Sequence, residues 1–118
     1  PTVLVNVTPE MDIAKDMEVF GPVFPIIGFD TLEEAVGIAN SSIYGLMGGV
    51  ITRDINKAMK VASRLECGGA VINGSGRYRT PETPFGGYKM SGLGREGISH
   101  TLEEMSQTKY IVMKRVLA

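Results

Sequence analysis

The feature that most constrains the fold is an alternation of apolar, strand-like runs with amphipathic helical stretches along the 118-residue chain. The run at 23–29 is mainly apolar, which is typical of a strand buried on both faces. Pro25 within it indicates an edge or a bulge, because proline has no amide hydrogen to donate to a sheet. Runs rich in strand-forming residues and bounded by turn residues occupy 3–7, 23–29, 46–52 and 70–73.

Two helices are predicted between these runs. Asp30 or Thr31 caps the first, whose apolar side chains recur at helical spacing and which ends near 40–42. Asp54 caps the second, and the glycine pair at 68–69 ends it. Because the connections are short, this order predicts an α/β fold. We expect a partial three-layer sheet of mainly parallel strands with right-handed crossover helices.

Other segments complete the predicted architecture. A threonine–proline pair predicts the start of a short helix over 9–17. Residues 98–105 have a helical pattern, and 109–113 have the composition of a last strand. Between 74 and 97 the chain lacks either pattern, and a loop of this length in a compact domain is usually functional or disordered.

Composition narrows the classes of function. A net charge of -1 argues against a nucleic-acid groove or an anionic membrane surface as the main partner. One cysteine, Cys67, allows no intrachain disulfide and no cysteine-based zinc cluster, which fits a reducing, cytoplasmic compartment. No apolar run has the length of a membrane span, and no signal peptide is visible. The start at Pro1 and a mean hydropathy of +0.07 lead us to expect a segment of a larger protein, with surface covered by other parts.

The glycine-rich stretch 85–97 contains the string Gly92-Leu93-Gly94-Arg95-Glu96-Gly97, which matches G-x-G-x-x-G. A dinucleotide fingerprint needs a buried strand directly before it, and the residues at 88–91 do not form a convincing one. Tight turns between packed elements are therefore favoured over a phosphate cradle.

Other candidate residues have both structural and functional interpretations. Cys67 could be a nucleophile, but a small buried thiol is favoured, because the only potential base, His100, lies on another element. One histidine cannot build a metal site, so none is expected. Glu18 would oppose the dipole at the end of the helix over 9–17, which suggests a carboxylate kept for a hydroxyl ligand rather than an ordinary surface group. Phe20 is either core or a plate for a planar ring.

Arg77 and Arg79 flank Tyr78 in the long loop. They are either solvated surface charges or a pair of guanidinium groups at the mouth of a site for an anionic substrate.

These motifs together resemble the C-terminal part of the NAD(P)-dependent aldehyde dehydrogenase superfamily. One matching piece would be weak, but seven in order are specific to the superfamily, though not to a substrate. The pieces are 18–23 (EVFGPV), 44–46 (YGL), 52–54 (TRD), 69–73 (GAVIN), 84–89 (PFGGYK), 91–97 (SGLGREG) and the last strand.

The resemblance implies a role for several residues. Glu18 matches the glutamate that binds the nicotinamide-ribose hydroxyls, and Phe20 matches the phenylalanine beside the nicotinamide. Phe85 matches an aromatic residue of the aldehyde tunnel, and 74–83 matches the variable stretch at the tunnel mouth. The strand at 109–113 resembles the one that crosses to another subunit.

The resemblance also implies a division of the chain. Residues 1–105 would be the C-terminal portion of the catalytic domain, and 106–118 the oligomerisation strand and tail of a homodimer or homotetramer. The family's catalytic cysteine, general-base glutamate, oxyanion-hole asparagine and Rossmann domain would lie upstream of Pro1, so this segment would have no catalytic residue and no activity alone. Met17 and Ile43 depart from the family pattern, but neither carries an implied role.

The resemblance implies oxidation of an aldehyde to a carboxylate with NAD or NADP, through a cysteine thioester. NAD(P) would be bound mostly by the absent N-terminal part. Arg77 and Arg79 suggest a small, anionic aldehyde; lactaldehyde, succinate semialdehyde and glyceraldehyde 3-phosphate are candidates within the family. The alternative is a non-catalytic α/β module that only self-associates through its apolar surface and last strand.

Overall fold

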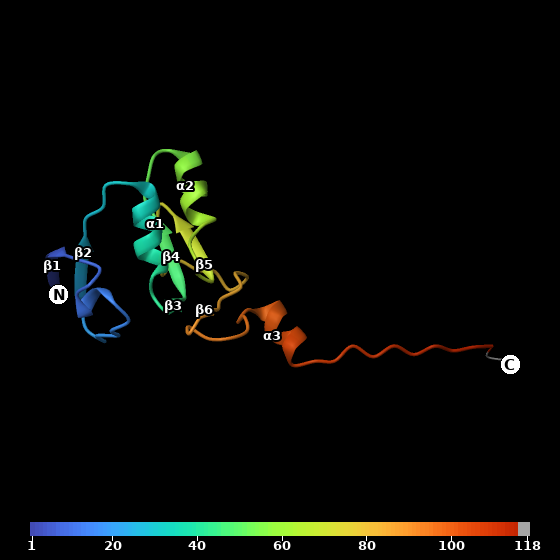
Figure 1. Ribbon diagram of the computed structural model, residues 1–118. Helices are drawn as coiled ribbons and strands as arrows, with labels where there is room; N and C mark the ends of the chain where they lie inside the picture. Colours follow the sequence, from blue (N-terminus) through green and yellow to red (C-terminus); the bar gives the residue numbers. More distant parts are fainter. Residues whose placement is uncertain (116–118) are drawn as a thin grey trace.

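The computed structural model describes residues 1–115. Its N-terminal part is a parallel pair of strands, β1 (Thr2–Val7) and β2 (Val23–Ile27), with Thr2 opposite Val23. A short 3-10 helix, η1 (Asp12–Ala14), lies in the connection between them. Figure 1 shows this pair as a separate lobe beside the rest of the chain.

The central part alternates helices and strands as predicted. The side-chain oxygen of Thr31 accepts a 3.1 Å hydrogen bond from the amide of Glu34 and caps α1 (Leu32–Asn40). Asp54 caps α2 (Ile55–Ala62) in the same way, with a 3.1 Å bond from the amide of Lys57. The helix α2 connects the parallel strands β4 (Met47–Val50) and β5 (Gly69–Ile72), as expected for a crossover.

The prediction of an α/β fold with mainly parallel strands is confirmed, but the strands do not join in one sheet. Within residues 1–115 they form three two-stranded sheets. The third pairs β3 (Tyr44–Gly45) with β6 (Tyr88–Lys89) in antiparallel register, and neither of these short strands was predicted. The last helix, α3, spans Ile98–Glu104, close to its predicted bounds.

The predicted helix over 9–17 is wrong, because only η1 forms there. Its N-cap, Met11, makes no side-chain hydrogen bond, and both Met11 and Met17 remain exposed. A helix this short needs an apolar face packed on a neighbour to be stable, and this segment has none among the described residues.

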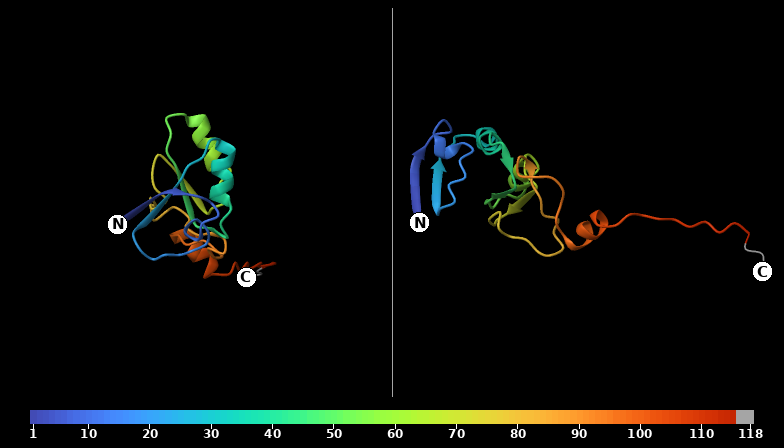
Figure 2. Two further views of the ribbon diagram at one scale, coloured as in Figure 1. Left: turned by 60° about the vertical axis from the view of Figure 1, so that its left-hand side comes forward. Right: turned by 90° about the horizontal axis from the view of Figure 1, so that it is seen from below.

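Very little of the described chain is buried. The buried apolar side chains are Val7, Val36 and Ala58 alone among residues 1–115. The radius of gyration is 20.4 Å, whereas a compact domain of this length would have about 13–14 Å. Much of the difference comes from the C-terminal segment, which extends away from the body (Figure 2).

That extended segment includes the predicted last strand at 109–113. Within the described residues it pairs with no other strand, and the side chains of Tyr110, Ile111, Val112 and Met113 are exposed. The end of the predicted tail, 116–118, lies outside the described residues. None of the helices in the described part of the chain has the length and apolar character needed to cross a membrane.

Candidate functional site

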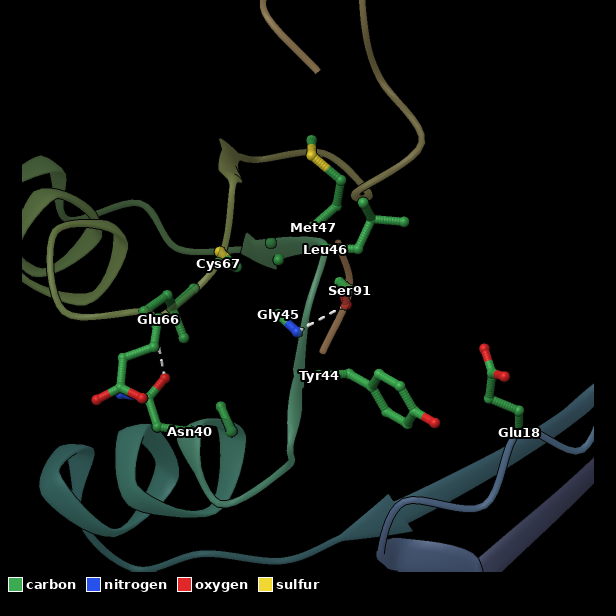
Figure 3. Close-up of a pocket in the computed structure, with 13 residues that line it drawn as sticks. Glu18, Asn40, Tyr44, Gly45, Leu46, Met47, Glu66, Cys67 and Ser91 are labelled. Carbon is green, nitrogen blue, oxygen red and sulfur yellow. Dashed lines mark hydrogen bonds between the residues drawn. The ribbon is translucent and has the colours of Figure 1, made fainter. Parts of the chain in front are cut away.

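A cavity of about 430 Å³ is lined by Glu18 of the N-terminal lobe and by residues of the central part. Its walls come from β3, β4, the end of α1, the segment after α2 and the glycine-rich loop. Figure 3 shows the labelled lining residues, which are Glu18, Asn40, Tyr44, Gly45, Leu46, Met47, Glu66, Cys67 and Ser91.

Glu18 lies at one end of this cavity. Figure 3 shows its carboxylate and the ring of Tyr44 turned toward one another. Within residues 1–115, no hydrogen bond or ion pair engages this carboxylate, so its oxygens are available as acceptors. The argument that Glu18 opposes a helix dipole fails, because the helix over 9–17 does not form. Its place on the cavity wall is an independent reason to single it out.

Phe20, two residues further on, has a 95% exposed ring. Its backbone φ is 51°, a left-handed conformation that costs a residue other than glycine about 1–3 kcal/mol. A large apolar ring is stable in such a position when something covers it. An acceptor-only carboxylate and an open aromatic face on one loop suit a ligand that combines hydroxyl donors with a flat ring.

Phe85 lies in a neighbouring cavity of about 350 Å³, which shares Leu46 and Ser91 with the first. Its amide and carbonyl both bond to Glu96, with N···O distances of 2.8 and 2.6 Å. The guanidinium carbon of Arg79 lies 4.1 Å from the centre of the Phe85 ring, and an Arg79 nitrogen lies 3.7 Å from a Glu96 carboxylate oxygen. These contacts close the glycine-rich loop at its base and fix the ring of Phe85.

The two arginines singled out from the sequence therefore differ. Arg79 is engaged by Phe85 and Glu96. Arg77 is exposed, and among residues 1–115 it makes no hydrogen bond or ion pair. Of these two arginines, only Arg77 has a guanidinium group with all its donors available among the described residues.

The glycine-rich loop is built from turns rather than as a phosphate cradle. The strand before Gly92 is β6, a two-residue antiparallel strand, and not the buried parallel strand that a dinucleotide fingerprint needs. A Cβ added at Gly68 would overlap the carbonyl oxygen of Gly86. Glycine at 68 therefore lets the loop backbone approach the start of β5 closely.

Sequence reasoning missed residues that hold this site together. The Lys89 ammonium donates to the carbonyls of Asn40 (2.7 Å) and Ser42 (3.0 Å) and lies 2.7 Å from the Glu66 carboxylate. The Asp16 carboxylate accepts hydrogen bonds from the Ser42 hydroxyl and the Ile43 amide, in the turn between α1 and β3. These partners are separated by more than twenty residues in sequence, so no local pattern could have identified them.

Cys67 lies between α2 and β5, and its thiol donates to the carbonyl of Gly69 over 3.1 Å. This half-buried, bonded thiol fits the structural interpretation. Among the residues that the structure describes, no cluster of three or more histidine, cysteine, aspartate or glutamate side chains could hold a metal ion.

The fold is an α/β segment with two neighbouring cavities that share Leu46 and Ser91 in their walls. Comparison with known proteins identifies its family. The model of the aldehyde dehydrogenase family matches residues 1–111, and the chain belongs to this family. The resemblance predicted from the sequence motifs is thus confirmed.

Relatives and a solved structure support this assignment. The chain is 56% identical over 107 residues to a lactaldehyde dehydrogenase of Methanococcus maripaludis, covering 91% of this chain and 23% of that protein. It is 41% identical to a 3-sulfolactaldehyde dehydrogenase of Priestia aryabhattai, covering 96% of this chain and 24% of the relative. The crystal structure of a glyceraldehyde-3-phosphate dehydrogenase of Methanocaldococcus jannaschii, complexed with NADP, matches with a TM-score of 0.83 and 48% identity. That match covers 89% of this chain and 22% of the other.

The chain thus spans about a quarter of the length of these relatives, as expected for a segment of a larger enzyme. All three are aldehyde dehydrogenases by name, which favours the oxidoreductase interpretation over a module that only self-associates.

Proposed function

We propose that this chain is the C-terminal portion of the catalytic domain (1–105) and the oligomerisation strand and tail (106–118) of an NAD(P)-dependent enzyme that oxidises a small aldehyde to a carboxylate. The observation that carries the proposal is the loop with Glu18 and Phe20. The Glu18 carboxylate lies at the cavity without a hydrogen-bond or ion-pair partner among residues 1–115, and the Phe20 ring is exposed. The catalytic cysteine and general base are proposed to lie outside this segment.

In this proposal Glu18 and Phe20 act on the cofactor. NAD(P) accepts the hydride from the substrate when it is bound. The Glu18 carboxylate accepts hydrogen bonds from the nicotinamide-ribose hydroxyls, and the Phe20 ring packs beside the nicotinamide. Together they orient the cofactor, because two fixed contacts on one loop restrict its rotation. Most of the remaining cofactor contacts are proposed to come from the N-terminal part of the enzyme.

The test is Glu18→Ala in the full-length enzyme, with Glu10→Ala, another exposed carboxylate of the N-terminal lobe, as the matched control. Loss of hydrogen bonds to a charged acceptor predicts a rise of about 10- to 100-fold in the Kd for NAD(P). The control should bind the cofactor as the wild type does. Unchanged NAD(P) affinity in Glu18→Ala, measured by titration calorimetry, would overturn the cofactor role.

The substrate side of the proposal rests on Phe85, Arg77 and Arg79. Phe85 forms a wall of the aldehyde tunnel, and the arginines bring positive charge to its mouth, which favours a small, anionic aldehyde. The names of two relatives, a 3-sulfolactaldehyde and a glyceraldehyde-3-phosphate dehydrogenase, refer to anionic aldehydes, whereas lactaldehyde is neutral. Arg77→Ala should therefore raise the KM for an anionic aldehyde about tenfold and leave that for lactaldehyde unchanged.

Assembly and location complete the proposal. Residues 109–113 are proposed to add a strand to the sheet of a second subunit in a dimer or tetramer, since their exposed backbone and apolar side chains are free to pair. A cytoplasmic location is proposed from the single cysteine, Cys67, which allows no intrachain disulfide.

A further inference from the structure

Asp16 lies two residues before Glu18 and is bonded to a distant part of the chain. One oxygen of its carboxylate accepts a 2.8 Å hydrogen bond from the Ser42 hydroxyl and a 2.9 Å hydrogen bond from the Ile43 amide. Both donors belong to the turn between α1 and β3, which leads directly into the cavity wall at Tyr44.

This turn is fixed from its other side. The Lys89 ammonium bonds the carbonyls of Asn40 and Ser42, and the Met90 amide donates to the Ile43 carbonyl over 2.9 Å. The Lys89 side chain is only 26% exposed, and its ion pair with Glu66 adds a third attachment. The turn is therefore held by several hydrogen bonds and can support the segment that Asp16 attaches to it.

The segment that carries Glu18 has little else to hold it. Between η1 and β2 the chain has no helix or strand, and Phe20 packs on almost nothing. Among residues 1–115, the bonds of Asp16 are the only hydrogen bonds or ion pairs that join 15–22 to any residue after 30. The position of the Glu18 carboxylate at the cavity thus depends on Asp16.

We propose that Asp16 is a positioning residue, which fixes the Glu18–Phe20 loop on the turn between α1 and β3 and thereby holds Glu18 where it meets the cofactor. This inference rests on the proposed cofactor role of Glu18. It also implies that the Glu18–Phe20 loop and the glycine-rich loop are attached to one turn, because Asp16 and Lys89 both bond Ser42.

The experiment compares variants of the full-length enzyme by NAD(P) affinity, steady-state kinetics and melting temperature. Asp16→Ala should raise the Kd and KM for NAD(P) about 3- to 10-fold, as expected for the loss of two ordinary hydrogen bonds. The KM for the aldehyde at saturating cofactor should not change. Asp16→Asn should restore most of the affinity, because its amide oxygen still accepts from Ile43.

Asp12→Ala is the matched control. It removes a carboxylate from the same connection, and Asp12 is 87% exposed and pairs only with Lys15 at 3.9 Å among the described residues. It should leave both KM values unchanged. If Asp16→Ala does not fold, Ser42→Ala decides the question. It removes one of the two Asp16 bonds, together with the 3.1 Å bond that the Ser42 hydroxyl accepts from the Tyr44 amide. A rise of about 2- to 5-fold in the Kd for NAD(P) that Ser42→Ala produces in the wild-type enzyme but not in Asp16→Asn supports the positioning role, and a rise of equal size in both overturns it.

The outcomes separate this inference from the proposed function. If Glu18→Ala weakens NAD(P) binding and Asp16→Ala does not, the positioning role is wrong and the cofactor role stands. If neither variant affects NAD(P) binding, the cofactor role of Glu18 itself is wrong. An Asp16→Ala enzyme whose two KM values rise equally, with a lower melting temperature, would show a general structural role instead.

Discussion

The two sides of the candidate site differ in how complete they are within this chain. Phe85 is held by the paired backbone of Glu96 below it and by the Arg79 guanidinium 4.1 Å above its ring. Phe20 has a 95% exposed ring on a loop tied to the rest of the chain through Asp16. The side with Phe85, which is proposed to meet the substrate, is thus structured by the segment itself. The side with Glu18 and Phe20, which is proposed to meet the cofactor, is an exposed surface in this segment.

The largest expected effect concerns the segment that this chain leaves most exposed. Adjacent residues of a strand point their amides to opposite sides, so one of the amides of Ile111 and Val112 faces the strand proposed to pair with 109–113. Proline at that one position removes a hydrogen-bond donor from the ladder between subunits. One of Ile111→Pro and Val112→Pro should convert the assembled enzyme to a smaller species by light scattering. Gln107→Pro, outside the predicted strand, is the control. Unchanged mass for both variants would show that 109–113 does not pair between subunits.

A matched pair of alanine substitutions tests the comparison directly. Phe85→Ala should lower the free energy of unfolding by about 1–3 kcal/mol, because a half-buried ring and its stacked arginine lose contact. Phe20→Ala should leave stability almost unchanged in the absence of NAD(P) and raise the Kd for NAD(P) about tenfold. Thermal unfolding with and without cofactor measures both. Equal destabilisation by the two substitutions would contradict the contrast between the two sides.

The two loop arginines provide a smaller contrast. Arg79→Ala should cost about 0.5–1 kcal/mol of stability, the usual contribution of a cation–π contact at a partly exposed site. Arg77→Ala should cost nothing measurable, because the Arg77 guanidinium has no partner among residues 1–115. Chemical denaturation of both variants distinguishes them. A larger loss for Arg77 than for Arg79 would mean that Phe85 is not held by Arg79.

The smallest expected effect is a pH dependence of stability through Glu33, which lies outside both sides of the candidate site. The hydrogen bond from Lys60 is the main cause that lowers the pKa of Glu33 below its ordinary value of 4.5, with Arg64 contributing through the same oxygen. A lowered folded-state pKa means that this stabilisation is complete above pH 4.5 and is lost as the pH falls through the folded pKa. Because Glu33 is solvent-exposed, Glu33→Gln should flatten the acid limb of the stability curve only slightly. An unaltered acid limb would show that Glu33 does not contribute.

Local signals predicted the parts of the fold that depend on local interactions. Both helices begin where they were expected, α1 at Thr31, one of the two predicted caps, and α2 at Asp54. A cap needs only a side chain and an amide three residues later. The helix over 9–17 failed for the opposite reason, since no packing surface supports it. The strands β3 and β6 were missed because each is two residues long and is paired with a segment more than forty residues away.

The candidate site also contains residues that motifs identified and contacts that only the structure revealed. Glu18, Phe20 and Phe85 were singled out by motif, and the structure places Glu18 and Phe85 on cavity walls and leaves the Phe20 ring exposed. The attachment of Arg79 to Phe85, and that of Asp16 and Lys89 to one turn, depend on three-dimensional proximity alone. Sequence spacing contains no information on such contacts, so the two arginines looked equivalent until the fold separated them.

The close approach of Gly68 and Gly86 has a consequence for how enzymes with this segment diverge. Two backbones that meet without room for a Cβ keep the base of the glycine-rich loop in one register, whatever sequence precedes it. Exposed side chains of 74–83 that do not contact Phe85, such as those of Arg77 and Tyr78, can be exchanged while Arg79 keeps Phe85 in place. In the proposed enzyme, a duplicated gene could therefore change its aldehyde preference through a few substitutions in this stretch, without disturbing the loop below it.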